Sequence, residues 1–248
     1  MNEETKRKAD ELDPSYREGL LTLAQSFCLP FWWHDPNNRT GDGILHNGTV
    51  CLVNTGAKVM AVTANHVLTG LEADLRKMPE LVCQFGSITV NPLDRLIDRD
   101  ATLDLATFAA PDFADIAWVS HRVVPWPSKR IEKGEVVYYG GFPKTGRTAG
   151  QLKAKIYFDA MFWTPMDVTD RSIVLTCGNE QSYWPNKPEG EEINIDPGGY
   201  SGGPVYRVDE TAPTTYLELV GFISELTFFP VMRATHADFA RADGTIAR

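Results

Sequence analysis

The clearest chemical signal in the sequence is a serine inside a cluster of glycines, Gly199-Tyr200-Ser201-Gly202-Gly203-Pro204. Glycines let the backbone turn tightly and bring amide N–H groups beside the serine hydroxyl. Such N–H groups can stabilise the negative charge that develops on a carbonyl oxygen under nucleophilic attack. The segment therefore predicts an acyl-transfer nucleophile, although Gly-Gly-Pro alone is also a common turn.

A serine hydroxyl is a weak nucleophile at neutral pH and needs a neighbouring base, for which histidine is best suited. His66 stands out because it follows an apolar run, Val62-Thr63-Ala64-Asn65, where a rigid strand would deliver the side chain to a cleft. We therefore predict that His66 is the base. It competes with four other histidines, which are His34, His46, His121 and His236.

A third candidate is Asp104, which stands between apolar residues in Leu103-Asp104-Leu105-Ala106. A buried carboxylate is costly unless it accepts hydrogen bonds, and an imidazole N–H would satisfy it while fixing the histidine tautomer. Asp98 and Asp100 lie in a polar stretch, and we expect both to be solvated. Asp104 is therefore the predicted partner of His66.

The elements that must position these residues are mostly short strands. Runs rich in β-branched and aromatic residues alternate with Gly, Pro and Asn, and no regular alternation with long helices is apparent, which indicates an all-β sandwich or barrel. We also expect an amphipathic helix within residues 1–27 and a short helix within 234–247. The predicted strands are 48–54, 58–64, 81–90, 105–110, 135–140, 153–158, 172–177, 204–207 and 217–223.

Taken together, these segments resemble the trypsin-like (chymotrypsin-fold) serine peptidases, of a bacterial intracellular type. Thr63-Ala64-Asn65-His66 matches the family's Thr-Ala-x-His motif, and Asp104-Leu105-Ala106 matches its Asp-[Ile/Leu]-Ala motif. The serine segment matches Gly-x-Ser-Gly-Gly-Pro, and the order His, Asp, Ser is that of the family. Gly140-Gly141-Phe142-Pro143 also looks like an element common in bacterial members.

The resemblance implies two perpendicular, six-stranded antiparallel β-barrels with a peripheral N-terminal helix and a short C-terminal helix. Residues 1–40 would form an N-terminal helical extension and 41–125 the first barrel, with His66 and Asp104. Residues 126–233 would form the second barrel, with Ser201, and 234–248 a C-terminal tail or helix.

The resemblance also implies a serine endopeptidase that works through an acyl-enzyme. Ser201 would be the nucleophile, His66 the base and then the acid, and Asp104 its orienting partner, while the N–H groups of Gly199 and Ser201 would form the oxyanion hole. The family's substrate-binding strand and specificity pocket would fall on Ser224, Glu225, Leu226, Ile195 and Asp196.

Two departures from the family pattern limit what can be carried over. Tyr200 stands where many secreted members have an Asp that pairs with a newly cut N-terminus. Glu225-Leu226 replaces the usual Trp-Gly, so the preference for the residue before the cut cannot be transferred. Control by a partner protein is a further expectation, by analogy with domains found beside bacterial defence modules. Its candidate surfaces are the N-terminal helix and the loop 184–192.

Composition excludes several other classes of protein. The formal net charge is −9, which argues against nucleic-acid binding. No apolar run approaches the roughly 18 residues of a membrane span, and the charged start does not resemble a secretory signal, so we expect a cytoplasmic protein. The four scattered cysteines have no zinc-site spacing. The expected partner is a protein or peptide substrate, with no cofactor and no metal.

Three alternatives use the same residues. Gly-x-Ser-x-Gly also occurs in α/β-hydrolases, but that fold needs its acid and histidine after the serine, and only 47 residues, with Asp209 and His236, follow Ser201. A subtilisin-like order would need Asp35 or Asp42 before His66, and neither has a convincing context. A catalytically silent or latent module that binds peptides in the same cleft remains open.

Overall fold

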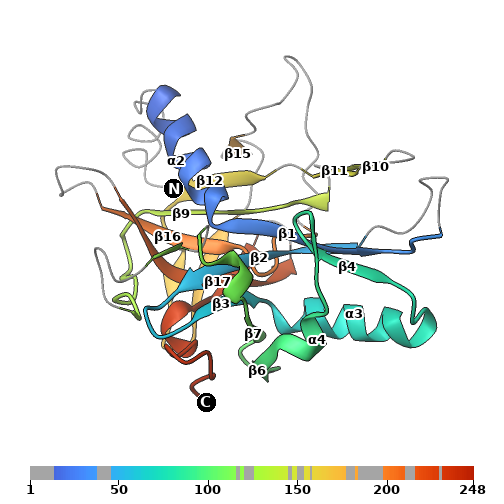
Figure 1. The fold of residues 1–248 in the computed structure, drawn as a ribbon. Helices are drawn as coiled ribbons and strands as arrows, with labels where there is room; N and C mark the ends of the chain where they lie inside the picture. Colours follow the sequence, from blue (N-terminus) through green and yellow to red (C-terminus); the bar gives the residue numbers. More distant parts are fainter. Residues whose placement is uncertain are drawn as a thin grey trace.

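The computed structural model describes residues 14–37, 46–115, 118–119, 126–144, 147–149, 154–156, 158–176, 182–183, 198–209, 216–228 and 231–248. Within these ranges the chain is mainly β, with two large sheets and few helices (Figure 1). The expected all-β fold class, with two antiparallel units, is confirmed.

The first sheet has the strand order β5-β4-β1-β2-β3-β7-β6, and all of these neighbours are antiparallel. A short strand, β8, pairs with β2 in parallel. The strands are β1 (Cys28–His34), β2 (His46–Asn54), β3 (Val59–Thr63), β4 (Val82–Phe85), β5 (Ile88–Thr89), β6 (Leu96–Asp100), β7 (Leu105–Ala109) and β8 (Trp118–Val119).

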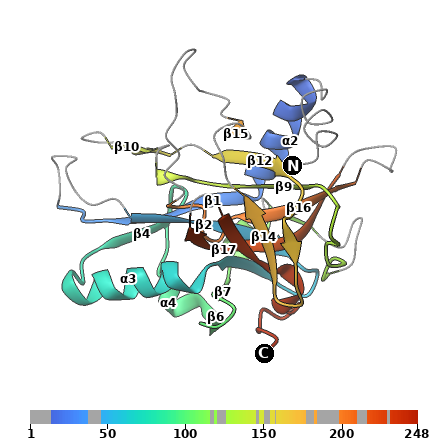
Figure 2. The same ribbon diagram turned by 180° about the vertical axis from the view of Figure 1, so that it is seen from behind.

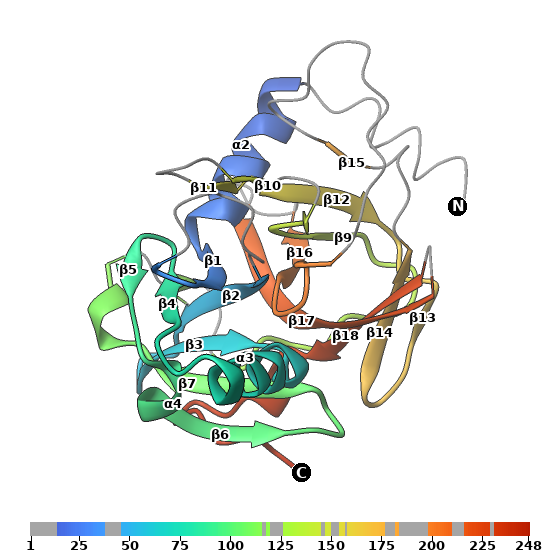
Figure 3. The same ribbon diagram turned by 90° about the vertical axis from the view of Figure 1, so that its right-hand side faces the viewer.

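The second sheet has the order β13-β14-β18-β17-β16-β9-β12-β15, of which Figure 2 shows β14, β17, β16, β9 and β12 from behind. β10 and β11 form a separate two-stranded ribbon (Figure 3). Within the described ranges each large sheet thus has eight strands, where six were expected. The strands are β9 (Val137–Gly141), β10 (Arg147–Ala149), β11 (Ala154–Ile156), β12 (Asp159–Trp163), β13 (Asp167–Val168), β14 (Ser172–Thr176), β15 (Ser182–Tyr183), β16 (Pro204–Asp209), β17 (Tyr216–Phe228) and β18 (Val231–His236).

Alternation along the central strands divides the core into three parts. In β2, Val50 and Leu52 pack inside the first sheet, whereas Cys51 and Val53 face a core shared with the second sheet. The same alternation occurs in the second sheet, which has its own inner cluster. Because successive strand residues point to opposite faces, strands with both faces buried hold the two sheets together. The site lies where they meet.

Two longer helices lie at opposite ends of the molecule (Figure 3): α2 (Pro14–Ser26), which was expected, and α3 (Asn65–Lys77), which was not. α3 buries Val67, Leu68 and Leu71 on one face. The shorter elements are α4 (Pro92–Arg95) and two 3₁₀ turns, η1 (Pro111–Phe113) and η4 (Ala237–Phe239). None of the described helices is long and apolar enough to cross a bilayer.

Two expected boundaries need correction. Residues 28–34, assigned to the N-terminal extension, form β1 and pair with both β2 and β4, so the first sheet begins before residue 41. The expected C-terminal helix is confined to the 3₁₀ helix η4, because β18 continues to His236. Burial of Met232, Ala234 and His236, in a segment that pairs with β14 and β17, favours a strand up to that residue.

The chain then returns to the first sheet, and this corrects the expectation that Asp98 is merely solvated. The Ile246 N–H donates to Asp98 Oδ2 at 2.9 Å, and Arg248 binds Asp98 Oδ1 at 2.6 Å. Burial alone would raise the pKa of Asp98, but these hydrogen bonds outweigh it and hold the pKa below its usual value. Thr107 Oγ1 also donates to the Gly244 carbonyl, at 2.5 Å. The C-terminal segment therefore fastens β6 and β7, which flank Asp104.

His236 gives the fold a testable pH dependence. Its ring is buried, and Nε2 lies 2.8 Å from the Thr169 carbonyl. Burial lowers the pKa of His236 below its usual 6.5, and repulsion by Arg130 acts in the same direction, against the hydrogen bond to Thr169. At mildly acidic pH, His236 therefore binds a proton more readily in the unfolded chain than in the folded one. The free energy of unfolding should fall as the pH drops below about 6.5.

Denaturant titrations at several pH values test this expectation. One proton contributes a slope of at most about 1.4 kcal/mol per pH unit. His236→Gln, whose amide can still donate to Thr169 but does not titrate, should lose this contribution and show a flatter pH dependence. An unchanged slope in the variant would assign the pH dependence to other groups.

Candidate active site

His66 is placed by a strand that ends directly before it. β3 is buried from Met60 to Thr63, Ala64 is extended at the N-cap of α3, and His66 lies in the first turn of that helix. Backbone N–H groups in a first helical turn lack partners within the helix. The His66 N–H finds its acceptor in Asp104 Oδ1, at 2.8 Å.

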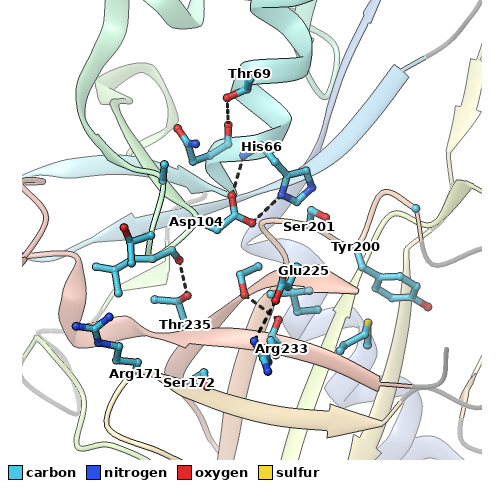
Figure 4. A pocket seen from close by; sticks show the side chains of 18 residues that line it. His66, Thr69, Asp104, Arg171, Ser172, Tyr200, Ser201, Glu225, Arg233 and Thr235 are labelled. Atoms are coloured by element: carbon cyan, nitrogen blue, oxygen red, sulfur yellow. Dashed lines mark hydrogen bonds and ion pairs between the residues drawn. The ribbon is translucent and has the colours of Figure 1, made fainter. Parts of the chain in front are cut away.

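The same carboxylate also holds the imidazole. His66 Nδ1 lies 2.7 Å from Asp104 Oδ2, so one oxygen of Asp104 accepts from the backbone of His66 and the other from its ring (Figure 4). Next to a carboxylate acceptor, Nδ1 carries the proton and Nε2 is left to accept one. The His66 side chain is 51% exposed and that of Asp104 20%, so the ring is open to the pocket while its partner is mostly covered.

Asp104 is held in an uncommon backbone conformation. Its φ is +50°, in the left-handed region that Asp adopts more readily than most residues. Asp100 Oδ1 shapes the preceding turn by accepting from the N–H groups of Thr102 (2.8 Å) and Leu103 (2.9 Å). Thr235 of β18 donates to the Leu103 carbonyl at 2.6 Å. Asp100 was expected to be merely solvated, but it builds the turn that presents Asp104.

Ser201 lies in a loop that only glycines permit. Gly199 and Gly202 have φ values of +104° and +88°, and a Cβ on Gly202 would collide with the Thr49 carbonyl and with Thr63 Oγ1. The Gly202 N–H donates to the Ile223 carbonyl at 2.7 Å. These contacts fix the serine loop between the first sheet and β17.

Thr49 of β2 connects the two sheets at this loop, and no sequence motif pointed to it. Its N–H donates to the Ser201 carbonyl (2.8 Å), and its hydroxyl donates to the Gly199 carbonyl (2.7 Å). The same hydroxyl accepts from the Phe142 N–H at 3.0 Å. Thr49, a residue of the first sheet, thus holds the carbonyl groups of the two residues that flank Tyr200. Phe142 belongs to the Gly-Gly-Phe-Pro segment that the resemblance had picked out.

The loop leaves two amide donors unused. Among the described residues, neither the Gly199 N–H nor the Ser201 N–H has an acceptor. The carbonyl of each of these peptides is engaged, Gly198 O by the Lys144 N–H (2.5 Å) and Tyr200 O by the Gly203 N–H (2.7 Å). In a trans peptide the N–H points opposite to the carbonyl. The N–H groups of Gly199 and Ser201 therefore point away from Lys144 and Gly203, which bind the carbonyls.

A pocket of about 980 Å³ brings the three predicted residues together, since His66, Asp104 and Ser201 all line it. Within the described residues, no hydrogen bond joins His66 to Ser201. Figure 4 shows Ser201 on the side of the His66 ring that faces away from α3. The pocket thus combines an oriented imidazole with a hydroxyl.

The predicted substrate-binding residues fall into three groups. Ile195 and Asp196 lie outside the described residues, as does the loop 184–192. Ser224 and Glu225 of β17 line the pocket, and the Leu226 backbone pairs with Met232. The Ser224 hydroxyl donates to the Arg233 carbonyl at 3.1 Å, and Glu225 forms a 3.3 Å ion pair with the Arg233 side chain. Sequence reasoning missed several further lining residues, among them Arg171, Met232 and Arg233.

Comparison with solved structures returns several proteases at low sequence identity. The Rv3671c protease from M. tuberculosis, in its active form, has a TM-score of 0.47 and 13% identity, covering 91% of this chain and 82% of that one. The protease Anisep from Arthrobacter nicotinovorans has a TM-score of 0.47 and 13% identity, covering 86% and 90%. The thermostable serine protease AL20, from an extremophilic microorganism, has a TM-score of 0.43 and 14% identity, covering 86% and 93%. No family model and no curated protein matches the sequence.

The tight loop at Ser201 predicts that Gly202→Ala is strongly destabilising. The variant combines a strained φ with a collision against the Thr49 backbone, whereas Gly134, at φ +96°, has open space around the same added atom. Gly134→Ala is therefore the matched control for strain alone. In urea titrations we expect Gly202→Ala to lose at least about 2 kcal/mol more than the control. Equal losses would mean that the collision is relieved without cost.

Proposed function

We propose that this chain is a serine endopeptidase with Ser201 as nucleophile, His66 as general base and acid, and Asp104 as the orienting carboxylate. The observation that carries the proposal is the pair of hydrogen bonds that His66 donates to Asp104 beside Ser201. A carboxylate on Nδ1 leaves Nε2 as the base that a serine nucleophile requires. The N–H groups of Gly199 and Ser201, which have no acceptor in the part of the chain that the structure describes, support the same proposal.

In the proposed reaction, Ser201 Oγ attacks the carbonyl carbon of the scissile peptide while its proton passes to His66 Nε2. The N–H groups of Gly199 and Ser201 stabilise the oxyanion that forms. The tetrahedral intermediate collapses to an acyl-enzyme, and the amine leaves with the proton from His66. Water, deprotonated by His66, then attacks the ester, which releases the acid and restores Ser201.

The proposed substrate lies along β17. β17 is paired on one side with β18, up to Phe228, whereas its pairing with β16 ends at Phe222. The Ile223 N–H and carbonyl are taken by Gly203 and Gly202 of the serine loop, so the backbone groups beyond Ile223 can pair with an extended peptide by strand addition. Ser224, Glu225 and Leu226 would form this edge. Control by a partner protein stays a prediction.

Cleavage of a mixed peptide library, followed by mass spectrometry, tests the proposal and reads the sequence preference at the same time. The wild-type chain should cut a defined set of peptides, and Ser201→Ala, purified identically, should cut none. Equal cleavage by the two proteins would assign the activity to another group or a contaminant.

A second candidate is a latent or silent peptide-binding module with the same cleft. The absence of a hydrogen bond between His66 and Ser201 among the described residues favours this candidate, although such bonds are often long before substrate binds. Retention of library peptides by the wild-type chain, with no cleavage, would support the binding module and contradict the peptidase.

A further inference from the structure

Tyr200 lies between the two predicted oxyanion donors, yet its side chain faces away from the reaction. In Figure 4 the ring points away from His66 and Asp104. The residue is only 1% exposed, and its hydroxyl donates a hydrogen bond to the carboxylate of Asp159. A side chain within the catalytic loop is thus anchored deep in the second sheet.

The anchor for this hydroxyl is a fully buried acid. Asp159 is the first residue of β12, is 0% exposed, and pairs with Gly141 of β9. Carboxylates are rarely buried to this extent unless hydrogen bonds stabilise them. Gly141 is part of the same arrangement, because a Cβ there would come within 2.9 Å of Tyr200 Cα. The backbone and the hydroxyl of Tyr200 are therefore both fixed by the β9–β12 pair.

Within the loop, one described hydrogen bond, from the Gly203 N–H to the Tyr200 carbonyl, holds one of the two peptides that flank Tyr200. Gly199, Gly202 and Gly203 carry no side chain, so rotation about their backbone bonds is easy. Most of the described anchors from outside hold carbonyl groups, chiefly through Thr49, and the anchor on an N–H group, from Gly202 to the Ile223 carbonyl, lies beyond the two peptides that flank Tyr200. A turn of either peptide beside Tyr200 would swing an N–H group out of line with a substrate oxygen.

We propose that Tyr200, tethered by Asp159, is a positioning residue for the oxyanion-binding N–H groups of Gly199 and Ser201. The proposal rests on the proposed peptidase function. Tyr200 acts through the backbone on either side of it, and its side chain contacts no reacting atom. Asp159 is part of the second sheet, so its hydrogen bond with Tyr200 forms when the chain folds.

The test is the rate at which diisopropyl fluorophosphate inactivates the full chain, because its phosphoryl oxygen takes the place of the oxyanion. Tyr200→Phe should react about 10- to 100-fold more slowly, since outright loss of one oxyanion donor costs about 10²- to 10³-fold. The midpoint of the pH profile should stay at its wild-type value, because His66 and Asp104 are untouched.

Tyr139→Phe is the matched control. Tyr139 is equally buried in the same core cluster, and its hydroxyl donates to the Thr176 carbonyl rather than to Asp159. This variant loses a comparable hydrogen bond, and its inactivation rate should stay within about twofold of wild type.

Two substitutions of Asp159 change the acceptor of the same hydrogen bond. They test the proposal even if Tyr200→Phe fails to fold. Asp159→Asn keeps an oxygen that accepts the Tyr200 hydroxyl and should react at about the wild-type rate. Asp159→Leu keeps the branching at Cγ with a larger side chain that accepts no hydrogen bond, and should be slowed as much as Tyr200→Phe.

The outcomes separate the two proposals. If wild-type protein does not react with the reagent at Ser201, both the peptidase function and the positioning role are wrong. If wild type reacts and Tyr200→Phe or Asp159→Leu is as fast, only the positioning role is wrong. An equal slowing of Tyr139→Phe, or a shifted pH midpoint, would likewise show general damage instead of positioning.

Discussion

Ser201→Ala should lose peptide hydrolysis by a factor on the order of 10⁶ while the chain keeps its fold. The Ser201 carbonyl holds Thr49, and this bond survives in the variant because it belongs to the backbone. The hydroxyl makes no hydrogen bond among the described residues, so its loss leaves no buried partner exposed. Turnover of a library peptide that the wild-type chain cleaves measures the loss of hydrolysis. The melting temperature shows whether the fold is kept.

His66→Ala should lose about as much, because nucleophile and base act as one unit and removing either removes the same chemistry. The double variant should be no slower than either single variant. Additive losses would mean that His66 and Ser201 act independently, and hydrolysis at the wild-type rate in either single variant would refute their roles.

Asp104→Asn should lower kcat by about 10⁴-fold. Asn can adopt the left-handed φ of Asp104, so the turn should survive. Its amide, however, cannot accept both hydrogen bonds that the two carboxylate oxygens now take from His66. An NH₂ group facing Nδ1 favours the tautomer with its proton on Nε2, which cannot serve as base.

Steady-state kinetics on one library peptide, together with the melting temperature, check this prediction. Asp100→Asn is an informative control, because Asn keeps an oxygen for the N–H groups of Thr102 and Leu103 and can still form the turn. It should retain most of the activity. If Asp104→Asn were equally active, Asp104 would have no part in orienting the base.

The residues of the candidate site could be predicted from sequence because each depends on local chemistry. Ser201 needs its flanking glycines, and these stand next to it in the chain. His66 and Asp104 each follow or precede an apolar strand, which is visible as a change in composition. The strands β2, β3 and β7 were predicted nearly to the residue, because Val, Leu and Thr recur there between turn residues.

Other features depend on contacts between distant segments and leave little local signal. Thr49 is an ordinary strand residue in the sequence, and its role arises only when the second sheet brings Gly199 against it. α3 was missed although Val67, Leu68 and Leu71 have helical spacing, because a short apolar run fits strand and helix alike. The last strand, β18, was missed, and its last three residues were assigned to a tail helix, because this strand is defined by burial against β14 and β17.

Mapping of the residue modified by diisopropyl fluorophosphate tests the central claim most directly. Attack by an activated Ser201 displaces fluoride and leaves a diisopropylphosphoryl group on its oxygen. Peptide mass spectrometry of the wild-type chain should find one such group per chain, on Ser201, and none in His66→Ala. A modified residue other than Ser201, or equal modification when His66 is removed, would contradict the proposed triad.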